Sequence, residues 1–112
     1  MEKSHDFTLS IYKRTASFPK EELYGLVSQL RRSTSSIPIN LAEGSARATD
    51  LDTLKFYSYS FASAQETEYT LLLSKDLGYI DADSYKEYEK QILEIKAMLY
   101  GLIKTIKSRI KQ

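Results

Sequence analysis

Cysteine and tryptophan are absent from this chain of 112 residues, and glycine and proline occur only four and two times. The lack of cysteine excludes disulfides and thiolate zinc sites. No apolar run approaches the ~20 residues of a membrane span, and the N-terminal MEKSHDF lacks the apolar stretch of a signal peptide. So few glycines and prolines favour long helices. We therefore expect one cytoplasmic, helical domain over residues 1–112.

An excess of charge of one sign is also lacking. The chain has 16 basic and 15 acidic residues, and its formal net charge is +1. This balance gives no overall attraction to nucleic acid or to acidic lipid. The length is sufficient to bury a real core without help from a metal or a disulfide.

Four segments have the apolar spacing of helices, and the first is residues 4–16. Phe7, Ile11 and Tyr12 would face inward on this helix. The alternation of Phe7, Leu9 and Ile11 also fits a strand, so the two structures stay open for this segment.

The second predicted helix, residues 19–44, contains a proline. Its apolar residues recur at spacings of three and four, namely Leu23, Leu26, Val27, Leu30, Thr34, Ile37 and Leu41. The spacing continues through Pro38, which therefore predicts a kink within one helix rather than a break between two. Ser35 and Ser36 are expected to satisfy the backbone groups that the proline frees, and Gly44 to cap the C-terminus.

The third predicted helix begins at Thr49, with Asp52 as the acidic partner of a capping box, and runs to about Leu77 before Gly78. Its large side chains do not form one stripe: Leu54, Phe61, Tyr69 and Leu72 share one face, whereas Phe56, Tyr57, Ala64 and Leu71 point elsewhere. A helix that is apolar on several sides is buried on more than one. This pattern predicts a partner subunit.

The fourth predicted helix begins after Asp81 or Asp83 and runs to about Ile110. It carries a heptad seam of Tyr85, Tyr88, Ile92, Ile95, Leu99, Leu102 and Ile106. Its end is basic, with Lys104, Lys107, Arg109 and Lys111, which suits the negative end of a helix dipole. With short connections, the fold class is all-α: an antiparallel up-down-up-down four-helix bundle with a proline-kinked second helix.

A row of polar residues follows one face of the second helix: Arg32, Ser36, Asn40, Glu43 and Arg47. Their spacings of four, four, three and four residues place them within an arc of about 80°. A solvated outer face is one interpretation. Serine and asparagine are poor helix formers when merely exposed, so a polar seam within the bundle or between subunits is a second. An arginine-lined surface for phosphates is a third.

Catalytic and metal motifs are lacking. The chain has one histidine, His5, and no Glu-x-x-His pair of a di-iron bundle. No cysteine, activated serine or glycine-rich phosphate loop is present. Glu43, Glu66 and Glu68 could form a carboxylate pair, but ion pairs with the arginines of the second helix are favoured. We expect neither an enzyme nor a cofactor.

Several segments resemble one bacterial family. They are Gln29-Leu30-Arg31-Arg32, Ser36-Ile37-Pro38, Asn40, Ala42-Glu43-Gly44 and Arg47, flanked by Phe18-Pro19, Glu22-Leu23-Tyr24, Ala62-Ser63-Ala64 with Glu66 and Glu68, and Asp76-Leu77-Gly78-Tyr79-Ile80. Together they resemble the signature of four-helix-bundle proteins encoded in intervening sequences of 23S ribosomal RNA genes. The resemblance covers nearly the whole chain.

The resemblance implies an antiparallel four-helix bundle that forms a ring-shaped homopentamer and has no enzymatic activity. It also implies a relation to the accessory protein of diversity-generating retroelements, which binds nucleic acid and a reverse transcriptase. The leading hypothesis is therefore a self-assembling bundle with the polar row at its interface. The alternative is a nucleic-acid-binding scaffold that uses Arg31, Arg32, Arg47, Lys104, Lys107, Arg109 and Lys111.

Overall fold

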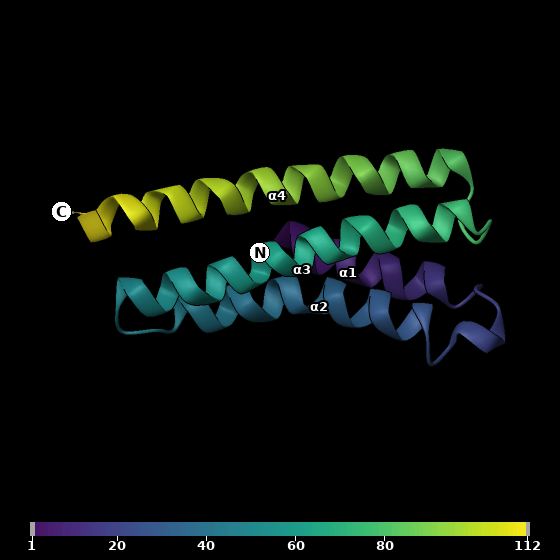
Figure 1. Cartoon of the computed structure of the whole chain (residues 1–112), viewed down its shortest axis with the longest axis horizontal. Helices are drawn as coiled ribbons and strands as arrows, with labels where there is room; N and C mark the ends of the chain where they lie inside the picture. The colour runs from purple at the N-terminus through teal and green to yellow at the C-terminus, as the bar shows by residue number, and fades with distance from the viewer. Residues whose placement is uncertain (1, 112) are drawn as a thin grey trace.

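The computed structural model describes residues 2–111 and contains four α-helices. They are α1 (Glu2–Thr15), α2 (Leu26–Ser45), α3 (Asp50–Asp76) and α4 (Ala82–Lys111), with a 3-10 turn, η1 (Lys20–Glu22), before α2. The molecule measures 50 × 24 × 20 Å. In Figure 1, α3 lies between α2 and α4, and α1 lies behind them. The predicted all-α four-helix bundle is confirmed, and the arrangement is consistent with the up-down-up-down order.

The first helix is confirmed but is the shortest of the four, with 14 residues against 20, 27 and 30. Phe7 and Ile11 are buried as predicted, whereas Tyr12 is 42% exposed, so its inward placement was wrong. Near the start of α1, Lys3 forms an ion pair with Glu94 at 3.1 Å, close to the middle of α4. The N-terminus therefore lies near the middle of the bundle (Figure 1), and the C-terminal half of α4 has no α1 beside it.

The second helix begins later than predicted. Residues 20–22 form η1, and α2 starts only at Leu26, after Gly25. The Glu22 carboxylate explains the start, because Oε1 accepts from the Leu26 N–H at 3.3 Å and Oε2 accepts from the Tyr79 hydroxyl at 3.0 Å. This segment is thus tied to the turn between α3 and α4. Leu23, predicted to belong to the apolar stripe, is 47% exposed.

From Leu26 onward, the predicted stripe of α2 is confirmed, and α2 continues through Pro38 as one helix. The expectation that Ser35 and Ser36 satisfy the backbone groups freed by Pro38 was wrong. Ser35 and Ser36 both donate to the Arg32 carbonyl at 3.2 and 2.8 Å, while the Thr34 carbonyl, four residues before the proline, accepts from the Thr8 hydroxyl of α1 at 3.4 Å. Whether Pro38 bends the axis stays a prediction.

Gly44 is a buried residue within α2, and not the cap that its position suggested. A Cβ there would lie 2.7 Å from the Tyr57 ring and 3.2 Å from the Phe56 Cβ. The glycine is therefore explained by the close approach of α3, since a side chain has no room at this point.

The ends of α3 match their sequence signals. The Thr49 hydroxyl accepts from the Asp52 N–H at 3.2 Å, which is the predicted N-cap. At the other end Gly78 has φ +85°, and the N–H groups of Gly78 and Tyr79 donate to the Lys75 and Ser74 carbonyls, both at 2.9 Å. This pair of bonds is a Schellman motif, which ends α3 at Asp76.

The last helix, α4, is also capped as predicted, because Asp81 Oδ2 accepts from the Ser84 N–H at 3.0 Å. Its seam is buried at Ile92, Ile95, Leu99 and Ile106, and half-buried at Tyr85 and Tyr88. The prediction was wrong for Leu102, which is 36% exposed. Leu102 belongs to the C-terminal half of α4, and in Figure 1 α1 does not run beside that half of the helix.

Candidate assembly surface

The third helix buries mainly small side chains, with Leu71 as the large exception, and exposes several large ones. Its buried residues are Ser60, Ala64, Thr67, Thr70, Leu71 and Ser74. Small side chains let α3 approach α2 closely, and the Ser60 hydroxyl donates to the Ile37 carbonyl at 2.9 Å. Thr67 similarly donates to the Ser33 hydroxyl at 3.0 Å. These contacts satisfy buried hydroxyls that would otherwise cost free energy.

Several large side chains of α3 lie on its outside, whereas Leu71 is buried and Tyr57, Phe61 and Leu73 pack against the core. Leu51, Tyr59, Tyr69 and Leu72 are 67%, 48%, 64% and 37% exposed. The helix therefore presents apolar area on both sides of its core-facing stripe, which agrees with the lack of one apolar face in the sequence. In a single copy of the chain these side chains therefore stay exposed, and the predicted burial of α3 on more than one side would need a second copy.

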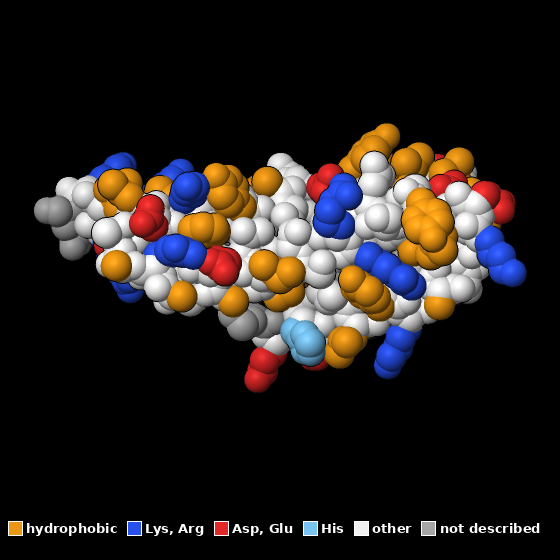
Figure 2. Space-filling model, turned by 90° about the horizontal axis from the view of Figure 1, so that it is seen from below, with side chains coloured by type: hydrophobic (Ala, Val, Ile, Leu, Met, Phe, Trp, Pro, Cys, Tyr) orange, Lys and Arg blue, Asp and Glu red, His pale blue; other side chains and the backbone are white. Residues whose placement is uncertain are grey.

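The polar row of α2 lies on the outside of this single copy. Arg32, Glu43 and Arg47 are exposed, and Ser36 and Asn40 are half-buried. Within α2, the Ser36 hydroxyl donates to the Arg32 carbonyl and the Asn40 amide to the Ser36 carbonyl, at 2.8 and 2.9 Å. Figure 2 shows the molecule from the side on which α2 lies in Figure 1, with hydrophobic, basic and acidic side chains interspersed along its length.

One end of the polar row joins the aromatic side chains of α3. Arg47 forms an ion pair with Glu43, and its guanidinium lies 4.7 Å from the centre of the Phe56 ring. Phe56 in turn meets Tyr59 edge-to-face, with ring centres 5.8 Å apart. Because Tyr59 is about half exposed, this series of contacts ends in an amphipathic aromatic side chain at the surface. We call Glu43, Arg47, Phe56 and Tyr59 the Arg47 cluster.

The seven predicted nucleic-acid contacts do not form one surface. Arg31 is held against α1, where it donates to the Thr15 hydroxyl and the Tyr12 carbonyl at 2.9 and 3.2 Å. Arg47 is paired with Glu43. The others are Arg32 on α2 and Lys104, Lys107, Arg109 and Lys111 on α4, and these two helices lie on opposite sides of α3 in Figure 1. Nucleic-acid binding stays a prediction.

Comparison with known proteins identifies the family. The family model described as 23S rRNA-intervening sequence protein matches residues 1–101. The chain belongs to this family. Its fold is similar to the crystal structure of a protein of unknown function from the S23 ribosomal protein family of Bacteroides thetaiotaomicron VPI-5482, with 27% identity and a TM-score of 0.83. The match covers 92% of this chain and 96% of the other. No match was found among curated proteins.

The resemblance drawn from the segments around Pro38 and Gly44 is thus confirmed for the 23S rRNA-intervening sequence family. Neither comparison describes an enzymatic activity, and the similar structure is described as having unknown function. The relation to retroelement accessory proteins remains an expectation. In the described part of the chain, no helix is sufficiently long and apolar to cross a membrane.

Two of the three glutamates considered for a carboxylate pair have cationic partners instead. Glu43 and Glu68 form ion pairs, the latter with Lys96 at 2.7 Å, so pairing was correctly predicted although Lys96 was not the expected partner. Glu66 is exposed, as is His5. Within residues 2–111, no group of three His, Cys, Asp or Glu side chains could hold a metal ion.

The pKa values that depart from their usual range have causes in the packing. The hydrogen bond to Glu22, followed by burial, raises the pKa of Tyr79. Burial and then the hydrogen bond to Glu89, at 3.1 Å, raise the pKa of Tyr85, and burial raises that of Tyr88. Hydrogen bonds from Ser84 lower the pKa of Asp81.

Sequence reasoning missed the aromatic part of the Arg47 cluster. It placed Arg47 in the polar row of α2 and Phe56 on an undefined side of α3, without bringing them together. A signal for this contact was present in the sequence. Gly44 lies just before the turn between α2 and α3, and its lack of a side chain permits the two helices to approach closely there. An arginine and an aromatic residue on opposite sides of such a crossing can stack.

Proposed function

We propose that this protein is a non-enzymatic scaffold whose copies assemble through the outer faces of α2 and α3 into a homo-oligomer, a ring of five subunits. The observation that supports assembly is the inverted pattern of α3, with small residues inside and Leu51, Tyr59 and Tyr69 outside. Large exposed apolar areas rimmed by polar residues are typical of protein interfaces. The number five rests on the family resemblance.

The Arg47 cluster has the composition of an interface centre. Tyrosine and arginine are enriched among the residues that dominate binding free energy. Tyr59 offers an aromatic ring with a polar hydroxyl, and Arg47 is already held by Glu43 and Phe56, so little side-chain entropy is lost on association. Ser36 and Asn40 beside it offer short hydrogen-bonding groups that permit close packing of a second helix.

Light scattering coupled to size exclusion tests the assembly at micromolar concentration. We expect a mass of about five times the 12.9 kDa of one chain for the unmodified protein. Tyr59→Asp places a charge in the proposed interface and should shift the mass toward one chain, because an unpaired buried charge is unfavourable. Tyr100→Asp is the matched control, since Tyr100 is an exposed tyrosine of α4, and it should leave the assembly intact.

The polar row is tested separately with Arg32→Ala and Asn40→Ala. Each should weaken assembly, while the free energy of unfolding of the dissociated chain changes by no more than ~0.5 kcal/mol, the size expected of an ordinary surface site. If the unmodified protein is a monomer at micromolar concentration, the proposal is wrong. If both alanine variants assemble normally, the row is a solvated face.

A further inference from the structure

Basic and acidic residues are distributed unevenly along the chain, which the net charge of the whole chain does not show. The eighteen residues after Glu94 contain five of the sixteen basic residues and none of the fifteen acidic ones. The net charge is therefore +5 over residues 95–112 and −4 over residues 1–94. A local positive field of this kind attracts acidic partners even when the whole molecule is nearly neutral.

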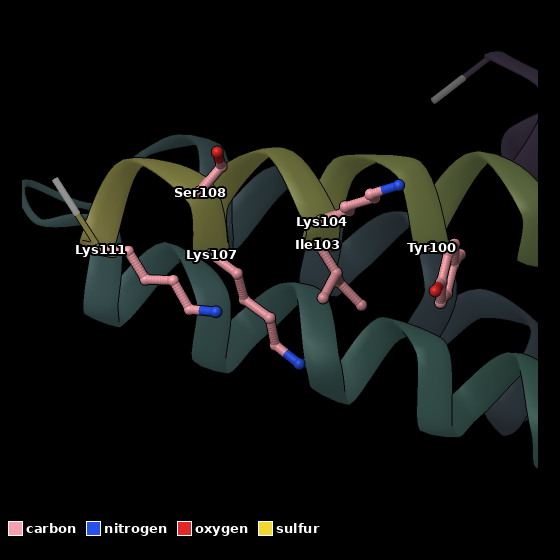
Figure 3. A pocket seen from close by; sticks show the side chains of 6 residues that line it. All are labelled: Tyr100, Ile103, Lys104, Lys107, Ser108 and Lys111. Carbon is pink, nitrogen blue, oxygen red and sulfur yellow. The ribbon is translucent and has the colours of Figure 1, made fainter.

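A groove follows this basic end of α4. Its outer part has a volume of about 310 Å³ and is lined by Tyr100, Ile103, Lys104, Lys107, Ser108 and Lys111. A second part of about 240 Å³ continues between α4 and α3, where Ser58 and Phe61 join Tyr100, Ile103 and Lys107. In Figure 3, Tyr100, Ile103, Lys107 and Lys111 extend from α4 on the side where α3 runs, and Ser108 points away.

The lysines of this groove carry positive charge that nothing nearby neutralises. Lys104, Lys107 and Lys111 are exposed and form no ion pair within the described residues 2–111. Lys96, one turn before Tyr100, provides the contrast, because Glu68 binds it at 2.7 Å. The last three turns of α4 therefore carry several cations and no acidic residue of their own.

The groove also has an apolar side. Tyr100 is 64% exposed, and Ile103 and Phe61 are half-buried where the two parts of the groove meet. An apolar strip with a lysine rim is complementary to a surface that combines apolar and acidic side chains. From Tyr100 to Lys111 the strip spans about 17 Å, or three helical turns.

We propose that this groove, which we call the basic groove, binds an acidic amphipathic helix of a partner protein. The apolar face of such a helix would cover Tyr100, Ile103 and Phe61, and its carboxylates would reach Lys104, Lys107 and Lys111. Such a helix would present its apolar anchors at spacings of three, four and seven residues.

A nucleic-acid strand fits the groove less well. Phosphates would satisfy the lysines but would leave Ile103 and Phe61 facing polar sugar and phosphate groups. Sequence-tolerant binding of single strands uses several aromatic residues on which successive bases stack, whereas Tyr100 is the exposed aromatic residue of this groove.

The basic groove shares no residue with the Arg47 cluster, so the inference does not depend on assembly.

Fluorescence anisotropy with a designed probe tests the inference on the full chain. The probe is a fluorescein-labelled peptide of ~18 residues, long enough to form a helix, with leucines on one face and glutamate and alanine elsewhere. A scrambled peptide of the same composition has no apolar face. An oligonucleotide of about 20 thymidines represents nucleic acid, and it is longer than the ~4–16 nucleotides of a typical single-strand site. We expect the designed peptide to bind at least about tenfold more tightly than either control.

Matched variants locate the binding. Lys104→Glu combined with Lys107→Glu should weaken binding about tenfold, and Tyr100→Ser about fivefold. Lys86→Glu combined with Lys90→Glu changes the net charge of α4 equally but lies outside the groove, and should change the affinity less than about twofold. Circular dichroism on each variant checks that the helices are retained. We expect them to be retained, because Tyr100 and the substituted lysines are exposed.

Three results would overturn the inference. Equal binding of the scrambled peptide would mean that only charge is recognised, and tighter binding of the oligonucleotide would make nucleic acid the occupant. No binding to the unmodified protein, but binding to Tyr59→Asp, would mean that a second copy covers the groove. Assembly is measured independently by mass, so failure of assembly and failure of peptide binding are distinguishable.

Discussion

At the scale of single residues, Gly44 and Gly101 differ in what surrounds the position of a Cβ. A Cβ on Gly44 would lie 2.7 Å from the Tyr57 ring, whose hydroxyl lies 3.3 Å from the Ser45 hydroxyl. Gly44→Ala should therefore destabilise the protein by about 1 kcal/mol or more, because overpacking of 1–3 kcal/mol exceeds the ~1 kcal/mol helix preference of alanine. Urea unfolding followed by circular dichroism measures the difference.

Gly101→Ala is the control for this substitution. Gly101 is exposed on α4, and nothing lies within 4 Å of its Cβ position. The same exchange should here stabilise the protein by about 0.5–1 kcal/mol, since alanine restricts the unfolded chain and favours the helix. If both variants shift stability in the same direction, packing at Gly44 is not the reason for its glycine.

The sequence could not distinguish these two roles of glycine. Gly44 comes near the end of an apolar stripe, where a C-cap is the usual explanation, and only the position of Tyr57 shows that it serves a helix crossing. Gly78 was predictable because it stands alone between two helices and takes a positive φ. A cap is a local feature, whereas a close approach depends on a residue distant in sequence.

At the scale of helices, the cap of α4 makes stability depend on pH. Hydrogen bonds from the Ser84 hydroxyl and N–H lower the pKa of Asp81 below its usual value. Because the pKa is lower in the folded state, the stabilisation is present above the unfolded pKa of about 3.9 and is lost as the pH falls through the folded pKa. Asp81→Asn retains a capping oxygen without the charge.

We therefore expect Asp81→Asn to be less stable than the unmodified protein at neutral pH, because it lacks the charge that Ser84 and Arg14 stabilise, and to lose less stability on acidification. Urea midpoints measured between about pH 6 and pH 3 would show the two curves converging at low pH. Asp83→Asn serves as the control, since the Asp83 carboxylate forms no hydrogen bond among the described residues. If Asp83→Asn flattens the pH dependence as much as Asp81→Asn, the cap is not its source.

Helix starts separate what was predictable from what was not. Thr49 and Asp81 are strong local caps; the sequence identified Thr49 and gave Asp81 as one of two candidates, beside Asp83. The start of α2 was placed about seven residues too early, because Leu23 continues the apolar spacing. Its actual start depends on Glu22, which is held by Tyr79 from the far end of α3. No pattern within the segment records that tertiary contact.

At the scale of the whole molecule, the apolar periodicity of the sequence predicts the order of the helices and their core-facing sides. It does not predict which surfaces stay exposed. A first helix of 14 residues and a fourth of 30 leave half of α4 without α1 beside it, and Leu102 in that half is exposed. Similarly, the balanced total charge gave no indication of the basic groove, because net charge averages over regions that fold apart. Both features need the three-dimensional arrangement.

Assembly also predicts how thermal stability depends on concentration. If folding and association are coupled, mass action raises Tm with total protein concentration. For a domain of this size, we expect a rise of about 3–6 °C for each tenfold increase in concentration. Tyr59→Asp should show a lower Tm that is independent of concentration, because its chains unfold singly. Differential scanning calorimetry across two decades of concentration provides the measurement. A Tm of the unmodified protein that stays constant over this range would contradict coupled assembly, and would assign the exposed residues of α3 to another partner.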